Sequence, residues 1–512
     1  MNNFKILLKS IFLIGIYFLF LACTQVQKDQ LPDPKIQAGI TKVDGKVTNF
    51  HLKKDEVAPI LILAVPNPVT AEMGVFKTQL SEDGSFHFEV PVECNINIGI
   101  IGSDMFNDNA VSVGLIPGEV TKLEISYDTA GKIKANMVSS LELTSDDLPN
   151  YYKMFINFME DHVNEASYTM TPEDFSHFAI EKLMVQRLKR SINDSIISGK
   201  AKNLIVNQCK LKYLKGCLLA YPDYISRNYR NFKPKGEPDN FTPQEPSISY
   251  YAFLKDFNLS DPQYLYNDQY TEVLQTILSN KTLNIPMIED TPIVDWLKGI
   301  KTNIAGLIGS DTGLFYEMLA ANAYARQFIN ELQPLSDKQK ENIRSYFKNG
   351  EVAKILFRKN ETIIKLEQEK NYYKTIVNKT PAVPKEKLME TIIAKYKGKA
   401  VVVDFWATWC GPCMNAMNDT REVKSEMKGK DIVFVYITNV SSPIKLWEEK
   451  IKIIGGEHYY LTKEEWVSVL DRFGFEGIPS YLFYDTKGVM KNKVTAYPGT
   501  ERMLKMTEDL LQ

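Results

Sequence analysis

An apolar segment that runs straight into a pair of closely spaced cysteines constrains the fold of this chain more than any other feature. Residues 400–405 read AVVVDF, and residues 409–413 read WCGPC. A short run rich in β-branched residues predicts a buried strand. Pro412 suits the first turn of a helix, where a missing backbone N–H costs nothing. The segment therefore predicts a strand, a tight turn and a helix that begins at Cys410.

The two cysteines are placed for thiol chemistry. At a helix N-terminus the unpaired N–H groups and the helix dipole favour an anion, so we expect Cys410 to have a lowered pKa and to supply the reactive thiolate. Cys413 follows one turn later, within reach of Cys410 and more buried, which suits a resolving thiol. The alternative is half of a zinc site, but zinc normally takes four ligands, and this region has no second C-x-x-C and one histidine, His458. We interpret Cys410 and Cys413 as a redox-active disulfide pair that needs no metal and no cofactor.

The residues around this motif alternate strands with helices. Strands are predicted by three further apolar runs, at 431–437, 480–484 and 489–496. Ser442 is expected to cap a helix that has Pro443 at its first position, and Thr462 with Glu465 forms a capping box for the next helix. The alternation predicts an α/β domain at 381–512.

Two other periodicities precede this domain. Between 38 and 142, short alternating runs separated by turn residues predict an all-β, sandwich-like domain, with a hairpin turn at 82–84. From 143 to 380, apolar residues recur every three or four positions, and Ser336 with Gln339 forms a capping box, which predicts an all-α domain. The predicted fold class is therefore multidomain: all-β, then all-α, then α/β.

The N-terminus has the pattern of an export signal. Positive residues precede an unbroken apolar run at 11–22, which is too short to cross a bilayer core that needs about 20 residues. Cys23 follows a small residue at the end of this run, as in a bacterial lipobox. We predict a lipoprotein signal peptide at 1–22, lipidation of Cys23 and a tether at 23–37. The alternative is cleavage nearby, with Cys23 incidental.

The remaining cysteines and the charge exclude other classes. Six cysteines in 512 residues cannot form a disulfide scaffold. Cys94, Cys209 and Cys217 are interpreted as small buried hydrophobes, although a break at Lys215-Gly216 would allow a Cys209–Cys217 bridge. A net charge of −2 provides no general field for nucleic acid. The basic and aromatic residues at 227–235 are interpreted as a helix end rather than a nucleic-acid surface.

The run VVVDFWATWCGPC at 401–413 resembles the thioredoxin superfamily, specifically its membrane-anchored TlpA/ResA-like members, over residues 385–512. The resemblance implies a thioredoxin-like fold for this domain. By position, Asp404 matches a buried acid that exchanges a proton with the resolving cysteine; the alternative is a solvent-facing residue at the strand end. Trp409, Gly411 and Pro412 match the active-site motif. Gly477, Ile478 and Pro479 match the substrate-binding loop with a cis-proline. The alternative is that Pro479 is an ordinary proline at the start of a strand.

The resemblance also implies a function. It indicates a thiol–disulfide oxidoreductase that is anchored by lipid, faces the periplasm, contributes to cell redox homeostasis and reduces disulfides in proteins such as apocytochromes. An electron donor in the inner membrane is implied as a further partner. Two positions depart from many relatives: Ala416 stands where a glutamate is common and Asn418 where a proline is, which bears on specificity. The alternatives are a disulfide isomerase, and a binding or scaffold lipoprotein with an auxiliary thioredoxin module.

Overall fold

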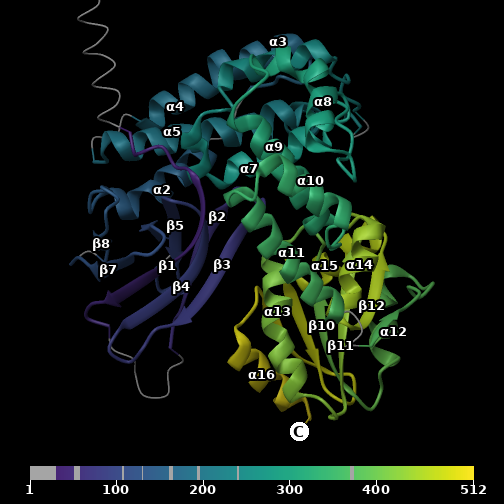
Figure 1. Cartoon of the computed structure of the whole chain (residues 1–512). Coiled ribbons are helices and arrows are strands. Elements are labelled where there is room, and N and C mark those ends of the chain that lie inside the picture. The colour runs from purple at the N-terminus through teal and green to yellow at the C-terminus, as the bar shows by residue number, and fades with distance from the viewer. Residues whose placement is uncertain are drawn as a thin grey trace, which may run out of the picture. The chain divides into compact units, whose positions relative to one another are not determined.

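The computed structural model describes most of the chain after the predicted signal peptide. The described residues are 30–511 except 51–57, 107–108, 130, 161–164, 193–195, 239–240 and 370–373. Cys23 and the predicted signal peptide lie outside them. The chain divides into two compact units, of which the first holds the described residues up to 326 together with 335–359, and the second holds 327–334 and the residues from 360 onward. Figure 1 shows the elements of each unit.

Two four-stranded sheets form one part of the first unit. The first has the order β4 (Ser85–Cys94), β1 (Ile36–Val47), β7 (Val120–Tyr127), β8 (Ile133–Val138). The second has the order β3 (Glu72–Gln79), β2 (Ile60–Asn67), β5 (Asn97–Gly102), β6 (Ala110–Leu115). Alternate residues of both sheets meet in one core that includes Val43, Leu63, Phe88 and Ile125, because successive side chains of a strand point to opposite faces.

The turn at 82–84 corrects the sequence prediction. It joins β3 to β4, but β3 pairs with β2 and β4 pairs with β1, so the turn links two sheets and is not a hairpin. The turn at 117–119 likewise joins β6 of one sheet to β7 of the other. A short turn signal indicates that the chain reverses; it does not determine which strand becomes the hydrogen-bonded partner.

Helices make up the rest of the first unit, and α2 packs on β6. The helices are α2 (Asp147–Glu160), α3 (Pro172–His177), α4 (Val185–Ile192), α5 (Gly199–Tyr213), α6 (Tyr221–Phe232), α7 (Asp268–Ser279), α8 (Ile293–Ile308), α9 (Leu314–Asn330), α10 (Asp337–Phe347) and α11 (Glu351–Glu369). The ends of α9 and α11 belong to the second unit. Two π-helical segments, η2 (Phe178–Met184) and η3 (Leu214–Leu219), and the 3₁₀ segments η1 (Asp104–Phe106), η4 (Ile248–Phe257) and η5 (Pro262–Tyr266) connect them.

Contacts within the first unit bear on two of the predicted boundaries. Leu31 is buried, and its carbonyl accepts a hydrogen bond from Gln263 of η5. This part of the predicted tether is therefore packed against the first unit. The predicted boundary at 142/143 falls inside this unit, next to the packing of α2 on β6. The division into a β domain and a helical domain stays a prediction.

The second unit is built on one mixed sheet. Its strands follow the order β14 (Met490–Thr495), β13 (Ser480–Tyr484), β10 (Ala400–Phe405), β11 (Ile432–Asn439), β12 (Gly456–Leu461), β9 (Thr375–Val377). β10, β11, β12 and β9 are parallel neighbours, whereas β13 runs antiparallel to β10, and β14 runs antiparallel to β13. β10 is buried along its whole length, as expected for a strand covered on both faces.

Helices cover both faces of this sheet. α12 (Leu388–Ala394) and α15 (Lys463–Phe473) pack on the face that carries Val401 and Val403. α13 (Gly411–Glu426) and α16 (Thr500–Glu508) pack on the face that carries Val402, and α14 (Ile444–Ile454) packs beside α13. Short 3₁₀ segments lie at η6 (Lys385–Lys387) and η7 (Asp509–Leu511).

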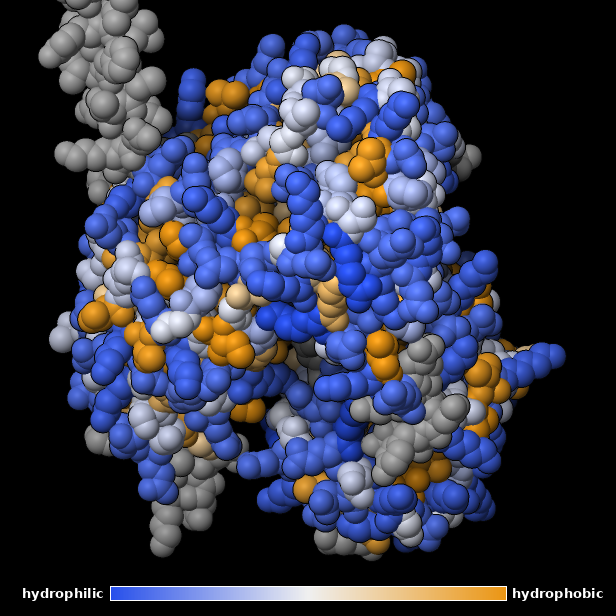
Figure 2. All heavy atoms as spheres, in the orientation of Figure 1, coloured by the Kyte–Doolittle hydropathy of each residue, from blue (hydrophilic) through white to orange (hydrophobic). Residues whose placement is uncertain are grey.

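The surface mixes polar and apolar groups. On the face in Figure 2, hydrophobic residues occur in small groups among hydrophilic ones, which is normal for folded proteins. Within the described residues, no helix combines the length and the apolar character that a membrane crossing requires.

Candidate active site

Cys410 and Cys413 meet at the start of α13. The two sulfurs form a disulfide, with Cα atoms 5.3 Å apart. Cys410 is the N-cap of the helix, and its Sγ accepts a hydrogen bond from the backbone N–H of Cys413 at 3.2 Å. Cys410 is 4% exposed and Cys413 is fully buried. Because the helix N-terminus favours negative charge, a thiolate formed on reduction is better stabilised on Cys410.

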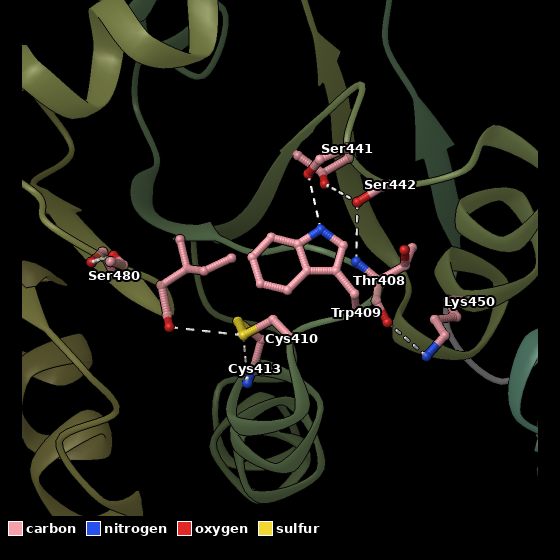
Figure 3. The surroundings of a disulfide bond; sticks show 11 residues. Thr408, Trp409, Cys410, Cys413, Ser441, Ser442, Lys450 and Ser480 are labelled. Atoms are coloured by element: carbon pink, nitrogen blue, oxygen red, sulfur yellow. Dashed lines mark hydrogen bonds between the residues drawn. A yellow bond between two sulfur atoms is a disulfide. The ribbon is translucent and has the colours of Figure 1, made fainter. Parts of the chain in front are cut away.

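The loop before the cysteines is held by hydrogen bonds that the sequence did not predict. The Thr408 N–H donates to the buried Ser442 Oγ at 3.0 Å, and Lys450 Nζ donates to the Thr408 carbonyl at 3.2 Å. The exposed indole of Trp409 donates from Nε1 to Ser441 Oγ at 3.0 Å. Figure 3 shows these bonds arranged around the disulfide.

Ser442 is a correction to the predicted capping pattern. Pro443, not Ser442, is the N-cap of α14, and no side chain caps this helix end. The Ser442 hydroxyl is instead turned inward, where it lies 2.8 Å from Thr438 Oγ1 and accepts from Thr408. A serine before a proline is a local capping signal, and nothing local reveals that a distant N–H competes for the hydroxyl.

A second loop lies against the disulfide. The carbonyl oxygen of Ile478 is 3.8 Å from Cys410 Sγ. The Ile478–Pro479 peptide bond is cis, and β13 begins directly after it at Ser480. Gly477 precedes the bond, and its carbonyl accepts from Ser480 Oγ at 2.7 Å. The structure thus brings the sequence-distant 477–479 segment to the side of the reactive sulfur.

Asp404 is buried rather than solvent-facing. It is 4% exposed on β10, and its Oδ1 has no hydrogen-bond partner among the described residues. Burial raises the pKa of this carboxyl to about 8, while the positive charge of Lys424 opposes the rise. Asp404 points to the sheet face that α13 covers, since it has the same strand parity as Val402. A carboxyl with this pKa can take up or release a proton near neutral pH.

Two further titratable residues lie near Asp404, one on α13 and one on the sheet. Lys424, near the end of that helix, donates from Nζ to the Ile454 carbonyl at 2.7 Å, and burial lowers its pKa to about 7. His458 is fully buried on β12, its ring stacks on Tyr436, and burial together with Lys424 lowers its pKa to about 3. His458 is therefore neutral, with Nε2 as the donor to the Gly455 carbonyl at 3.1 Å.

The other cysteines do not join this site. Cys94, Cys209 and Cys217 are buried and form no disulfide. The Cys209–Cys217 bridge that the sequence left open is therefore absent, because α5 continues into the π-helix η3 instead of breaking at Lys215-Gly216. Burial raises the pKa of the Cys94 thiol well above its usual value, which makes it a poor nucleophile. Within the described part of the chain, no cluster of His, Cys, Asp or Glu is arranged to hold a metal ion.

Comparisons with known proteins cover the same part of the chain. The Redoxin family model matches residues 378–501. An uncharacterized protein of Haemophilus influenzae is 30% identical over 117 residues, which are 22% of this chain and 73% of that protein. The thiol-disulfide oxidoreductase ResA of Geobacillus thermodenitrificans is 30% identical over 105 residues, which are 20% of this chain and 58% of that protein.

A solved structure of a thiol:disulfide interchange protein from Chlorobium tepidum is 24% identical; the match covers 23% of this chain and 84% of that one, with a TM-score of 0.21. The matches to ResA span less than two thirds of its length. The strand order, the disulfide at the start of α13 and the sequence matches define the class. The chain belongs to the thioredoxin superfamily as a TlpA/ResA-like member, and its C-terminal domain is a thiol–disulfide oxidoreductase domain of thioredoxin-like fold.

Proposed function

We propose that this protein is a membrane-anchored, extracytoplasmic thiol–disulfide oxidoreductase that reduces disulfides in substrate proteins. The observation that carries the proposal is the position of Cys410, whose Sγ caps α13, bonds to Cys413 and faces the carbonyl of Ile478. One sulfur is stabilised by a helix N-terminus, and the second is buried behind it. This asymmetry is what a nucleophile and a resolving thiol require.

The proposed reaction transfers two electrons from the reduced dithiol to the substrate. The Cys410 thiolate attacks one sulfur of the substrate disulfide, a mixed disulfide forms, and the other substrate sulfur leaves as a thiolate. The Cys413 thiol then loses its proton and attacks Cys410 Sγ. This step breaks the mixed disulfide, forms the Cys410–Cys413 disulfide and releases the second substrate sulfur. A reductant outside the chain must return two electrons before the next cycle.

Asp404 and the 477–479 loop are assigned supporting roles. We propose Asp404 as the base that accepts the Cys413 proton, because it is buried under α13 with a pKa near neutrality. The backbone of Ile478 would pair with an extended stretch of the substrate next to its disulfide, as in strand addition. Trp409, which is 63% exposed, would provide an apolar contact for the same stretch.

The location and the partners rest on the sequence. The apolar run at 11–22 and Cys23 support a lipid anchor and a periplasmic site. An electron donor in the inner membrane and substrates such as apocytochromes follow from the family resemblance alone. From the sequence we also propose a finer division of the chain. It comprises a sandwich-like β domain at 38–142, a helical domain at 143–380 and the thioredoxin-like domain at 381–512.

Trapping with Cys413→Ser tests the mechanism directly. This variant cannot resolve mixed disulfides, so substrates should accumulate on Cys410 and be identified by mass spectrometry. The matched control is Cys410→Ser, which keeps one thiol of the pair but not the nucleophile. Equal adduct yields from the two variants would reject the assignment of Cys410 as the attacking sulfur.

Two measurements separate the reductase from the alternatives. A reductase should have a reduction potential of about −250 mV or lower, whereas a value of about −120 mV would indicate an oxidant. Efficient refolding of a scrambled protein without added reductant would indicate an isomerase. Full function of a Cys410→Ser, Cys413→Ser double variant in cells would indicate a scaffold in which the thioredoxin-like domain is auxiliary.

A further inference from the structure

The inward face of α14 carries a buried lysine. Trp447 and Ile451 of this helix pack in the apolar cluster that contains the disulfide. Lys450 lies between them on the same buried side and is 8% exposed. The side chain of Lys452, two positions further on, is 49% exposed. A lysine normally extends its charged end into solvent, so a lysine that is buried beside an apolar cluster requires a specific polar partner.

The backbone of Thr408 provides such a partner. Lys450 Nζ donates a hydrogen bond to the Thr408 carbonyl at 3.2 Å. The N–H of the same residue donates to Ser442 Oγ at 3.0 Å. Figure 3 shows the two bonds on different sides of Thr408, which is 5% exposed. Both polar backbone groups of this residue are therefore held by the segment that follows β11.

Thr408 belongs to the turn that ends at the attacking sulfur. The Cys410 N–H donates to the Ala407 carbonyl at 3.0 Å, so residues 407–410 form a β-turn with Thr408 and Trp409 at its centre. The carbonyl that Lys450 contacts lies in the central peptide group of this turn. Cys410 then caps α13. The lysine is thus held against the short stretch of backbone that presents the nucleophile.

We propose that Lys450 is a positioning residue that holds a positive charge beside this turn and thereby favours the thiolate form of Cys410. The inference rests on the proposed function, in which Cys410 is the attacking sulfur. A nearby cation stabilises a thiolate in the same way as a helix N-terminus does. When the disulfide is reduced and the Cys410 thiol releases its proton to solvent, a negative charge appears beside a cation that is already in place.

Other titratable and charged groups also surround the cysteines. They lie on the packed helices and strands and on the loop before Pro479, and they are Cys413, Lys424, Asp404, Tyr436, Tyr460 and Glu476. All of them stay the same when only residue 450 is changed. A difference between variants at this position therefore reports the charge of Lys450.

The test follows the titration of Cys410 in the reduced full chain. Mass spectrometry measures the rate at which iodoacetamide alkylates Cys410 from about pH 5 to about pH 9, because only the thiolate reacts. In Lys450→Met the midpoint should rise by about one pH unit, which makes alkylation roughly ten-fold slower at the acidic end. Lys450→Arg keeps the charge and should hold the midpoint of the unmodified chain. Lys452→Met removes an exposed positive charge from the same helix and should not move it.

Two further variants separate the charge from the geometry of the turn. Lys450→Gln offers a neutral donor to the Thr408 carbonyl and should move the midpoint as Lys450→Met does, and it also serves if the methionine variant folds poorly. Ser442→Ala loosens the other side of Thr408 but keeps the charge, so it should move the midpoint much less. Equal shifts in Ser442→Ala and Lys450→Met would overturn the proposal.

A purely structural lysine would behave differently. Its loss would lower the thermal midpoint of unfolding and leave the titration of Cys410 where it is in the unmodified chain. Alkylation needs no substrate, so this readout is independent of the proposed reductase activity. Absence of insulin reduction by the unmodified chain with dithiothreitol would reject the proposed function, whereas an unmoved Cys410 titration in both Lys450→Met and Lys450→Gln would reject the role of Lys450.

Discussion

The buried hydroxyl of Ser442 accepts a hydrogen bond from the backbone N–H of Thr408 across 3.0 Å, which ties the loop before the cysteines to the loop after β11. Ser442→Ala would leave this N–H without its acceptor and also remove the contact with Thr438. A buried donor left unsatisfied costs about 1–3 kcal/mol. We expect chemical denaturation of the C-terminal domain to show a loss of this size. Ser441→Ala, a change at the exposed neighbouring residue, should change the free energy of unfolding by less than about 0.5 kcal/mol. A larger loss of stability in Ser441→Ala than in Ser442→Ala would contradict the role given to Ser442.

Trp409 is expected to matter for protein substrates more than for stability. Its side chain is 63% exposed, so Trp409→Ala should leave the free energy of unfolding nearly unchanged. Loss of one aromatic contact of about 1 kcal/mol corresponds to a roughly five-fold lower kcat/KM with a protein disulfide. Reaction of the disulfide with dithiothreitol, which is too small to use this contact, should keep its rate. Equal losses with both reactants would argue for damage to the disulfide itself.

Asp404→Asn should slow resolution of the mixed disulfide. Loss of a general base lowers a rate by about 100-fold or more when proton transfer limits the step. In the unmodified protein, resolution should accelerate as pH rises through about 8, where Asp404 becomes ionised. The Asn variant should lose this dependence in stopped-flow measurements of substrate release. If Asp404→Asn retained the same pH dependence, the general base for resolution would have to be another group.

His458 should make the C-terminal domain less stable in acid. Its pKa is about 3 in the folded chain, whereas its ordinary value is 6.5. Between these two pH values the unfolded chain binds a proton at this residue and the folded chain does not. The contribution to stability is present above about pH 6.5 and is lost as pH falls toward 3. His458→Phe keeps an aromatic ring beside Tyr436 but cannot be protonated. The free energy of unfolding of the unmodified protein should therefore fall more steeply from about pH 6.5 to pH 4 than that of the variant; parallel curves would contradict the lowered pKa.

Local patterns predicted the local structure well. The run at 400–405 forms β10 over those same residues, and both capping boxes, Ser336 with Gln339 and Thr462 with Glu465, are confirmed. Each of these features depends on residues within about three or four positions of one another. The turn at 82–84 failed as a hairpin because strand pairing depends on residues far along the chain.

The sequence by itself determined the chemistry of this protein, because a C-x-x-C between a buried strand and a helix allows few reactions other than dithiol exchange. Only the tertiary structure decided what surrounds the two sulfurs. The hydrogen bond between Ser442 and Thr408 joins residues 34 positions apart. Tyr481, Asp404, Tyr436 and His458 become neighbours only once four strands are in register. Burial raises the pKa of Asp404, and long-range packing places Lys424 over the ring of Tyr436, the strand neighbour of Asp404. The spacing of nearby residues predicts neither effect.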